Sequence, residues 1–185
     1  MFRTIANRLT LSRILMIPVI LLLLIMPYAW AAWTACVLFA IAAITDWLDG
    51  YMARRENQVS KIGQFLDPIA DKLLVSAVIL LLVYNRKIDG INVLPAVIIL
   101  LREVAVSGLR EYLAGLSVSV PVSRAAKWKT GIQLVALSFL IVGSDNTPFW
   151  LPATLVGDIL LWIAGGLTVL TGYDYWRASF KHFEN

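Results

Sequence analysis

Four aspartates are spaced as two pairs, each of which would share one helical face. Asp46 and Asp49 lie three residues apart, and Asp67 and Asp71 lie four residues apart; both spacings place side chains on the same side of a helix. Each pair stands where an apolar stretch meets a basic connection, and carboxylates near a bilayer are costly unless a cation neutralises them. Because oxygen ligands without nearby His or Cys suit Mg²⁺ or Mn²⁺, the pairs predict a site for one or two divalent ions.

A structural role is the alternative for the same four acids. They could form buried ion pairs with Arg54, Arg55 or Lys72, since charged residues inside a membrane pair with one another. Four acids exceed what three neighbouring bases need, which favours the metal site. Gly50 and Gly63 also remove side chains where two helices, or a helix and a ligand, must approach closely.

The rest of the chain indicates an all-α integral membrane protein. Its 185 residues are 59% hydrophobic and include seven Trp, and the mean hydropathy is +0.77. This is too apolar for a soluble domain and sufficient for about six spans of about 20 residues each. The apolar runs and their breaks predict a single domain over residues 1–185, with spans near 9–26, 28–54, 63–84, 94–113, 127–142 and 151–175.

The distribution of basic residues predicts the orientation of these spans. Fourteen of the 16 Lys and Arg fall on the side that would hold both termini and the four aspartates, whereas Arg86 and Lys87 fall on the other. The positive-inside rule makes the first side cytoplasmic. The sequence pI of about 9.4 therefore reflects topology and anionic phosphate partners, and not nucleic acid, which would need an exposed basic domain.

Cysteine and histidine chemistry is not indicated. Cys36 is the only cysteine and lies in an apolar run, as a core thiol would. His182 is the only histidine and lies in the polar tail, which argues against His-based nucleophilic catalysis and against a His-rich metal site.

The acidic motif resembles the signature of a known enzyme family. The pattern Asp-x2-Asp-Gly-x2-Ala-Arg-x8-Gly-x3-Asp-x3-Asp runs from Asp46 to Asp71 with every fixed position present. It resembles the CDP-alcohol phosphotransferases, integral membrane enzymes of phospholipid synthesis. The resemblance implies two divalent metals that hold the diphosphate of a CDP-linked lipid. It makes Asp46, Asp49 and Asp67 metal ligands, and Asp71 the general base and a further candidate ligand.

The resemblance also implies a pocket for the CDP-linked lipid. The segment Asn7-Arg8-Leu9-Thr10-Leu11-Ser12-Arg13 resembles the family's N-terminal Asn-x-Leu-Thr-x-x-Arg element, which would form an amphipathic interfacial helix with Arg13 pointing inward. An ordinary positive-inside anchor is the alternative for this segment. The residues implied to contact the CDP-lipid are Asn7, Thr10, Arg13, Gly50, Ala53, Arg54 and Gly63.

The residue types at the motif suit displacement at a diphosphate. A metal pair neutralises the leaving phosphate, and a carboxylate whose pKa is tuned by burial and nearby cations deprotonates an alcohol. No Ser, Cys or His occupies a fixed position of the motif, which favours direct transfer over a covalent enzyme intermediate.

Basic residues downstream of the motif are the candidates for an acceptor site. Arg110, Lys127 and Lys129 would lie at the cytoplasmic membrane surface and could converge on a phosphate, or could simply snorkel to the interface. Arg102, inside an apolar stretch, could pair with Glu103 or another acid. The run Arg-Glu-x4-Gly-x-Arg followed by Lys-Trp-Lys-Thr resembles the branch of the family that transfers the phosphatidyl group of CDP-diacylglycerol to sn-glycerol 3-phosphate.

Three functional interpretations remain at this point. The first is this metal-dependent transferase, either with glycerol 3-phosphate or with another acceptor such as inositol phosphate or serine. The second is a metal-ion transporter, whose acids would usually lie near the bilayer midplane, and the third is a structural membrane subunit. The family resemblance implies a homodimer in a bacterial inner membrane, and Gly157, Gly165 and Gly166 could allow close helix packing.

Overall fold

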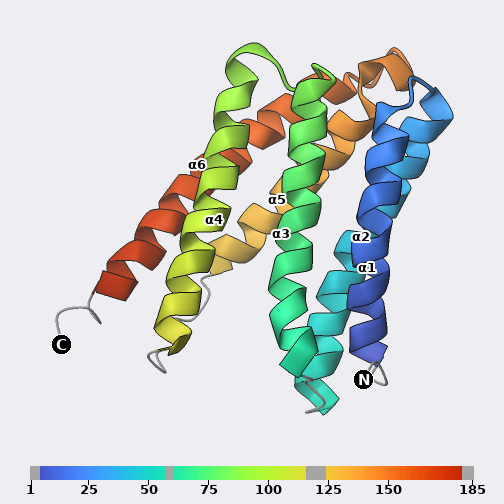
Figure 1. The fold of residues 1–185 in the computed structure, drawn as a ribbon. Helices are drawn as coiled ribbons and strands as arrows, with labels where there is room; N and C mark the ends of the chain where they lie inside the picture. The colour runs from blue at the N-terminus through green and yellow to red at the C-terminus, as the bar shows by residue number, and fades with distance from the viewer. Residues whose placement is uncertain (1–4, 57–60, 116–123, 181–185) are drawn as a thin grey trace.

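The fold is a bundle of long helices (Figure 1). The computed structural model describes residues 5–56, 61–115 and 124–180, and these residues contain no β-strand. Two short 3₁₀ helices, η1 at Gly90–Asn92 and η2 at Ser144–Asn146, lie in the connections. The α-helices are α1 (Ile5–Ile25), α2 (Ala29–Glu56), α3 (Lys61–Tyr84), α4 (Val93–Gly115), α5 (Arg124–Val142) and α6 (Ala153–Phe180).

The six predicted helical segments are confirmed, and the structure extends most of them by a few residues. Three described helical segments are long and apolar enough to cross a membrane, namely Gly90–Gly115, Ala125–Val142 and Ala153–Phe180. Shorter apolar stretches occupy α1, α2 and α3. The chain is therefore an all-α membrane protein. Its predicted N-terminal interfacial segment is continuous with α1, because that helix runs without a break from Ile5 to Ile25.

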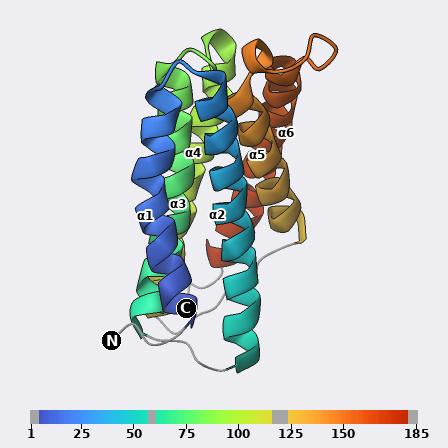
Figure 2. The ribbon, with the colours of Figure 1, turned by 90° about the vertical axis from the view of Figure 1, so that its right-hand side faces the viewer.

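The helices alternate in direction, so their ends form two distinct sets. One end of the bundle holds the first turns of α1, α3 and α5 and the last turns of α2, α4 and α6 (Figure 1). We call this the terminal end, and the opposite end, with η1 and η2, the loop end. Helix α1 packs on α2 and α3 (Figure 2), and α5 and α6 pack extensively on each other.

Apolar side chains fill the bundle and also cover much of its outside. Ile20, Phe39, Val78, Leu137 and Leu161 are completely buried in one core cluster, to which all six α-helices contribute. Large apolar side chains on the outward faces of all six helices are exposed. An apolar exterior is costly in water but is the expected surface of a protein solvated by lipid.

Two glycines of α6 allow close packing within the chain. A Cβ on Gly157 would lie 2.6 Å from Leu140 Cγ of α5, and a Cβ on Gly165 would lie 2.8 Å from Pro95 Cβ of α4. A Cβ on Gly166 would meet nothing within 4 Å. Only the first two therefore bring helices together here, and they do so inside one chain.

Lys87 stabilises the loop end. Its ammonium donates hydrogen bonds to the carbonyl oxygens of Ile141, at 2.5 Å, and Val142, at 3.3 Å, at the end of α5. The helix ends there at Gly143, which has φ +73°, a conformation that favours glycine. Burial lowers the pKa of Lys87, and Asp145 partly offsets this by attraction.

Candidate active site

The four aspartates lie on two helices that meet the terminal end. Asp46 and Asp49 belong to the last three turns of α2, and Asp67 and Asp71 to the first three turns of α3. Both pairs are thus in helices, as their spacing requires. The side chains of all four lie outside the described part of the structure, so the predicted metal site stays a prediction.

The other motif residues are placed at the level of the backbone. Gly50, Ala53 and Arg54 lie on α2 beside the first aspartate pair, and Gly63 lies in the first turn of α3. As with the aspartates, their side-chain environment lies outside the described part. Their assignment to the CDP-lipid pocket rests on the sequence alone.

Arg13 points into the bundle from α1. Its residue is only 2% exposed, which confirms the inward orientation expected from the sequence. Burial of a guanidinium requires compensating partners, and Arg13 makes interactions of this kind. Thr10 and Asn7 lie about one and two turns earlier on the same helix, respectively, with side chains outside the described part.

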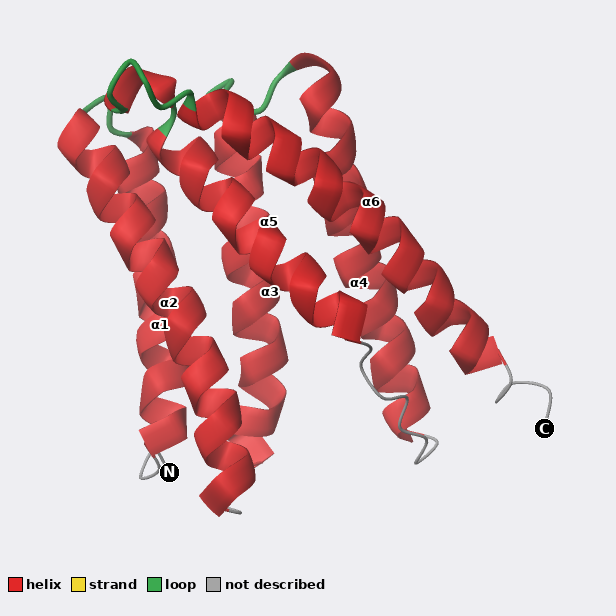
Figure 3. Cartoon of the chain, turned by 180° about the vertical axis from the view of Figure 1, so that it is seen from behind, coloured by secondary structure: helices red, strands yellow, loops and turns green. Residues whose placement is uncertain are grey.

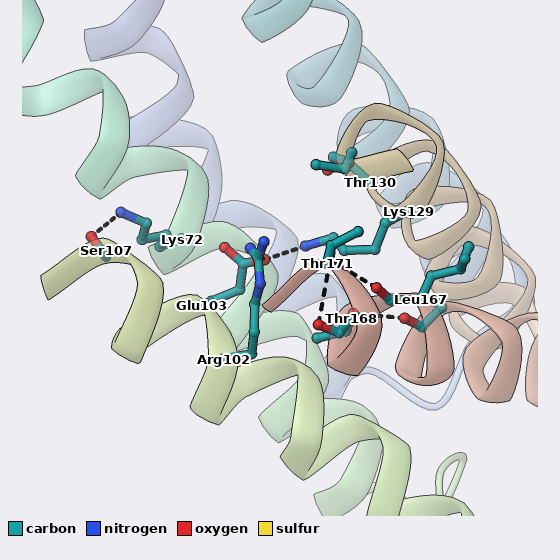
Figure 4. Close-up of polar contacts among 11 residues, drawn as sticks. Lys72, Arg102, Glu103, Ser107, Lys129, Thr130, Leu167, Thr168 and Thr171 are labelled. Carbon is teal, nitrogen blue, oxygen red and sulfur yellow. Dashed lines mark hydrogen bonds and ion pairs between the residues drawn. The ribbon is translucent and has the colours of Figure 1, made fainter. Parts of the chain in front are cut away.

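A polar contact connects the end of the acidic motif to α4. Lys72 directly follows Asp71 on α3, and its ammonium donates a hydrogen bond to the hydroxyl of Ser107 (Figure 4). This contact fixes the position of Lys72 beside the motif. Lys72, one of the three basic residues that could pair with the aspartates, therefore has a hydroxyl partner on another helix.

Glu103, one turn before Ser107 on α4, binds two cationic side chains. Its Oε1 atom accepts a hydrogen bond from Arg102 Nη1 at 3.3 Å and a second from the ammonium of Lys129 on α5 (Figure 4). The Lys129 side chain is 3% exposed, against 15% for Arg102 and 19% for Glu103. Lys129 is thus inside the bundle, where an ion pair compensates its burial, and it is not an exposed cation of the kind that snorkels to the interface.

Two polar atoms beside this ion pair are buried without a hydrogen-bond partner among the described residues. They are Nε of Arg102 and Oε1 of Gln133, which is one turn after Lys129 on α5. Gln133 is 3% exposed. Gly172 of α6 leaves room for Arg102, since a Cβ there would lie 3.2 Å from Arg102 Cγ. Unsatisfied buried groups are rare in proteins, so these atoms indicate a place for a polar ligand or water.

The remaining acceptor candidates are exposed near the terminal end. Arg110 lies two turns beyond Glu103 on α4, and its guanidinium carbon is 5.9 Å from the centre of the Tyr175 ring on α6. Lys127 lies near the start of α5. Figure 3 shows the ends of α4, α5 and α6 approaching the same end of the molecule. The structure thus separates one buried cation, Lys129, from two exposed ones.

The sequence alone did not predict three members of this polar group. It indicated no role for Ser107 or Gln133, and for Glu103 only a pairing with Arg102. The available signal was their spacing. Glu103 and Ser107, like Lys129 and Gln133, are four residues apart and share a helical face. Polar residues repeated at this interval in apolar helices indicate a buried polar contact. We call Lys72, Arg102, Glu103, Lys129 and Gln133 the buried cation cluster.

Similarity to known proteins identifies the family of this chain. The family model described as CDP-alcohol phosphatidyltransferase matches residues 3–170, which include the whole acidic motif and the buried cation cluster. A protein of Rickettsia felis is 48% identical over 98% of this chain and 98% of its own length. Relatives from Pseudomonas fluorescens and Bacillus subtilis are 43% and 38% identical, over 97% and 95% of this chain and 92% and 94% of their own lengths. All three are named CDP-diacylglycerol–glycerol-3-phosphate 3-phosphatidyltransferase. With this match over nearly all of its length, the chain belongs to the CDP-alcohol phosphatidyltransferase family.

Proposed function

We propose that this protein transfers the phosphatidyl group of CDP-diacylglycerol to sn-glycerol 3-phosphate, producing phosphatidylglycerophosphate and CMP. The observation that carries the proposal is the neighbourhood of two features on α3: the acidic motif ends at Asp71, and the buried cation cluster begins at Lys72. A diphosphate-activating site beside a group of cations suits a reaction between a nucleotide-linked lipid and a phosphorylated alcohol. The full-length relatives carry the name of this reaction.

The donor set of the acidic motif fits divalent metal ions. Four carboxylates on the adjoining ends of α2 and α3 supply oxygen ligands of the kind that Mg²⁺ and Mn²⁺ prefer. Asp46, Asp49 and Asp67 would hold the ions, two in our proposal, with Asp71 as an additional ligand. When bound, the ions neutralise the diphosphate and the charge that develops on the leaving CMP.

The protein's own residues perform the remaining steps. Asp71 accepts the proton of the acceptor hydroxyl, whose oxygen forms a bond to the phosphorus that carries the diacylglycerol. The bond from this phosphorus to the oxygen shared with the second phosphorus breaks, and CMP leaves with the bonding electron pair. Asn7, Thr10, Arg13, Gly50, Ala53, Arg54 and Gly63 bind and orient the CDP-lipid.

The acceptor phosphate is bound by cations. Lys129, and on the surface Arg110 and Lys127, form charge-assisted hydrogen bonds to it. A neutral acceptor would offer no negative charge to these cations. The cluster therefore favours a phosphorylated acceptor over serine.

The position of the site also bears on the other interpretations. The acids belong to the last three turns of α2 and the first three turns of α3, whereas the binding sites of secondary transporters lie near the bilayer midplane. We place the terminal end in the cytoplasm, following the distribution of Lys and Arg, with the chain crossing a bacterial inner membrane six times. We further propose a homodimer.

The test is an assay of the purified protein in detergent with CDP-diacylglycerol and Mg²⁺. CMP release and a lipid product should appear on addition of glycerol 3-phosphate and disappear when EDTA removes the metal. Inositol phosphate and serine are the competing acceptors, each tested at the same concentration. A faster reaction with either of them would reject glycerol 3-phosphate as the acceptor, and activity that persists in EDTA would reject the metal site.

A further inference from the structure

We propose that Glu103 is a positioning residue for the acceptor site, which holds Lys129 and Arg102 charged and in place for the phosphate of glycerol 3-phosphate. This inference rests on the proposed function. It concerns a residue that does not itself touch the reacting atoms. Its role follows from the two hydrogen bonds that one carboxylate oxygen accepts from two different helical positions.

The first step is the cost of keeping a lysine charged inside the bundle. Lys129 is 3% exposed, and a buried ammonium without a partner would lose its proton or withdraw along its flexible stem towards water. Glu103 is an acid to which Lys129 is joined. Removing one member of a buried ion pair takes away compensation from the other, so Glu103 contributes to both the charge and the position of Lys129.

The second step is the charge of the cluster as a whole. Its described side chains include three cations, Lys72, Arg102 and Lys129, and one carboxylate, Glu103 (Figure 4). Among the described side chains of the cluster, Glu103 therefore neutralises one of three positive charges and leaves an excess of two. A phosphate monoester carries a charge of about −1.5 to −2 at pH 7, which matches that excess.

The third step is the unused hydrogen-bonding capacity. Arg102 Nε is buried without a partner among the described residues, although Nη1 of the same guanidinium is bound to Glu103. Gln133, 3% exposed, also has an unsatisfied side-chain oxygen. Since the oxygen and nitrogen of an amide are interchangeable on rotation, Gln133 can present a donor instead. Glu103 thus fixes one edge of Arg102 and leaves a further donor for a ligand.

The fourth step is the location. Ser107, one turn from Glu103 on α4, binds Lys72, the residue next to the proposed base Asp71. Polar contacts therefore join Lys72, at the end of the acidic motif on α3, to Ser107 on α4, and Glu103 on α4 to Lys129 on α5 (Figure 4). A phosphate held here would be close in the fold to the helical turn that activates the acceptor hydroxyl.

The test compares Glu103→Gln with Glu103→Asp and the matched control Glu111→Gln, an exposed acid two turns away on α4. Glu103→Gln should raise the KM for glycerol 3-phosphate by about tenfold to a hundredfold, with less than about a twofold change in the KM for CDP-diacylglycerol. Glu103→Asp keeps the charge and should recover most of the loss, and Glu111→Gln should behave as wild type. A purely structural role would instead lower the amount of active enzyme and leave the KM values unchanged, which would overturn the inference.

A double variant keeps the test valid if Glu103→Gln folds poorly. Glu103→Gln combined with Lys129→Met removes both charges, so the protein should fold, and its KM for glycerol 3-phosphate should be no higher than that of Lys129→Met alone. Fully additive effects of the two substitutions would overturn the inference, because they would show that the residues act independently.

A binding measurement separates failure of this inference from failure of the proposed function. Glycerol 3-phosphate, and separately inorganic phosphate, should raise the Tm of the wild-type protein in detergent and should raise that of Glu103→Gln much less. If the wild type shows no CMP release with glycerol 3-phosphate, the proposed function fails. In that case an equal Tm shift in the two proteins would overturn the inference as well, and a shift confined to the wild type would support it.

Discussion

The carboxylate of Glu103 on α4 accepts a hydrogen bond from the buried ammonium of Lys129 on α5. These two helices pack on α6 far more than on each other. The ion pair is therefore a direct connection between two helices that the apolar packing holds apart. A contact of this kind places charged side chains in the interior without close approach of their backbones.

Asp46→Asn and Asp49→Asn should each abolish phosphatidyl transfer while the protein remains folded in detergent. An amide cannot supply the negative charge that a divalent ion requires of its ligands. The measurement is CMP release with saturating Mg²⁺, next to Asp174→Asn, an exposed acid of α6, which should keep wild-type activity. Near-normal activity in either motif variant would reject its assignment as a ligand.

Asp71→Asn separates the roles of base and ligand. If Asp71 acts chiefly as the base, the variant should lose about 10²- to 10⁴-fold in kcat with little change in affinity for CDP-diacylglycerol. Steady-state rates and equilibrium binding of the CDP-lipid measure the two quantities. Parallel loss of both would make Asp71 mainly a metal ligand.

Arg110→Ala and Lys127→Ala test the exposed part of the acceptor site. Charge-assisted hydrogen bonds contribute roughly 1.5–3 kcal/mol each, so either variant should raise the KM for glycerol 3-phosphate by about tenfold to a hundredfold. The KM for CDP-diacylglycerol should change little. Arg177→Ala, at an exposed cation in the last turn of α6, is the control. A selective rise in the KM for CDP-diacylglycerol would assign these cations to the nucleotide.

Gly165→Ala and Gly166→Ala form a matched pair on adjacent residues of α6. A methyl group at Gly165 would lie 2.8 Å from Pro95 Cβ, whereas at Gly166 it would meet nothing within 4 Å. Overpacking typically costs about 1–3 kcal/mol, so Gly165→Ala should lower the free energy of unfolding in detergent. Gly166→Ala should be neutral or should stabilise the helix by up to about 1 kcal/mol. Equal effects would contradict the packing of α6 on α4 described above.

Lys87→Met tests the loop end and its dependence on pH. The carbonyl groups of Ile141 and Val142 would lose their donor, which should lower the free energy of unfolding by about 1–3 kcal/mol. Arg86→Gln, at the exposed neighbouring cation, removes the same charge and should have a smaller effect.

The pH dependence follows from the direction of the pKa shift. Burial lowers the pKa of Lys87 from its usual 10.5, so the folded protein releases this proton at a lower pH than the unfolded chain. Stability due to this group should therefore rise as the pH rises from the folded pKa towards 10.5. The rise should be absent in Lys87→Met when unfolding curves are compared across that range.

The helices were predictable because long apolar runs and their breaks are local properties of the sequence. The end of α5 near Gly143 and the beginning of α3 near Gly63 lie within about two residues of their predicted positions, since a glycine or a polar turn interrupts the apolar run at each. The placement of the four motif aspartates on helices was predictable for a similar reason, because the spacing within each pair is local.

The environment of Lys129 was not predictable in this way. Its ion pair joins residues 26 positions apart, on helices whose relative rotation depends on packing against α6. The sequence shows a lysine near the start of an apolar helix, where snorkelling to the surface is the ordinary outcome. Only the fold shows that Glu103 faces it, and hence that this lysine is buried while Lys127 is exposed.

The even number of helices determines from which side of the membrane water-soluble substrates and products would reach and leave the site. The terminal end of the bundle holds the ends of α2 and α3 that carry the aspartates. It also holds the ends of α4 and α5 that carry Arg110 and Lys127. In the proposed reaction, glycerol 3-phosphate would be drawn from, and CMP returned to, the same aqueous compartment. The lipid substrate and product would reach the site from within the bilayer. Catalysis would then require no water-soluble metabolite to cross the membrane, and the enzyme would need no gated passage through its apolar core.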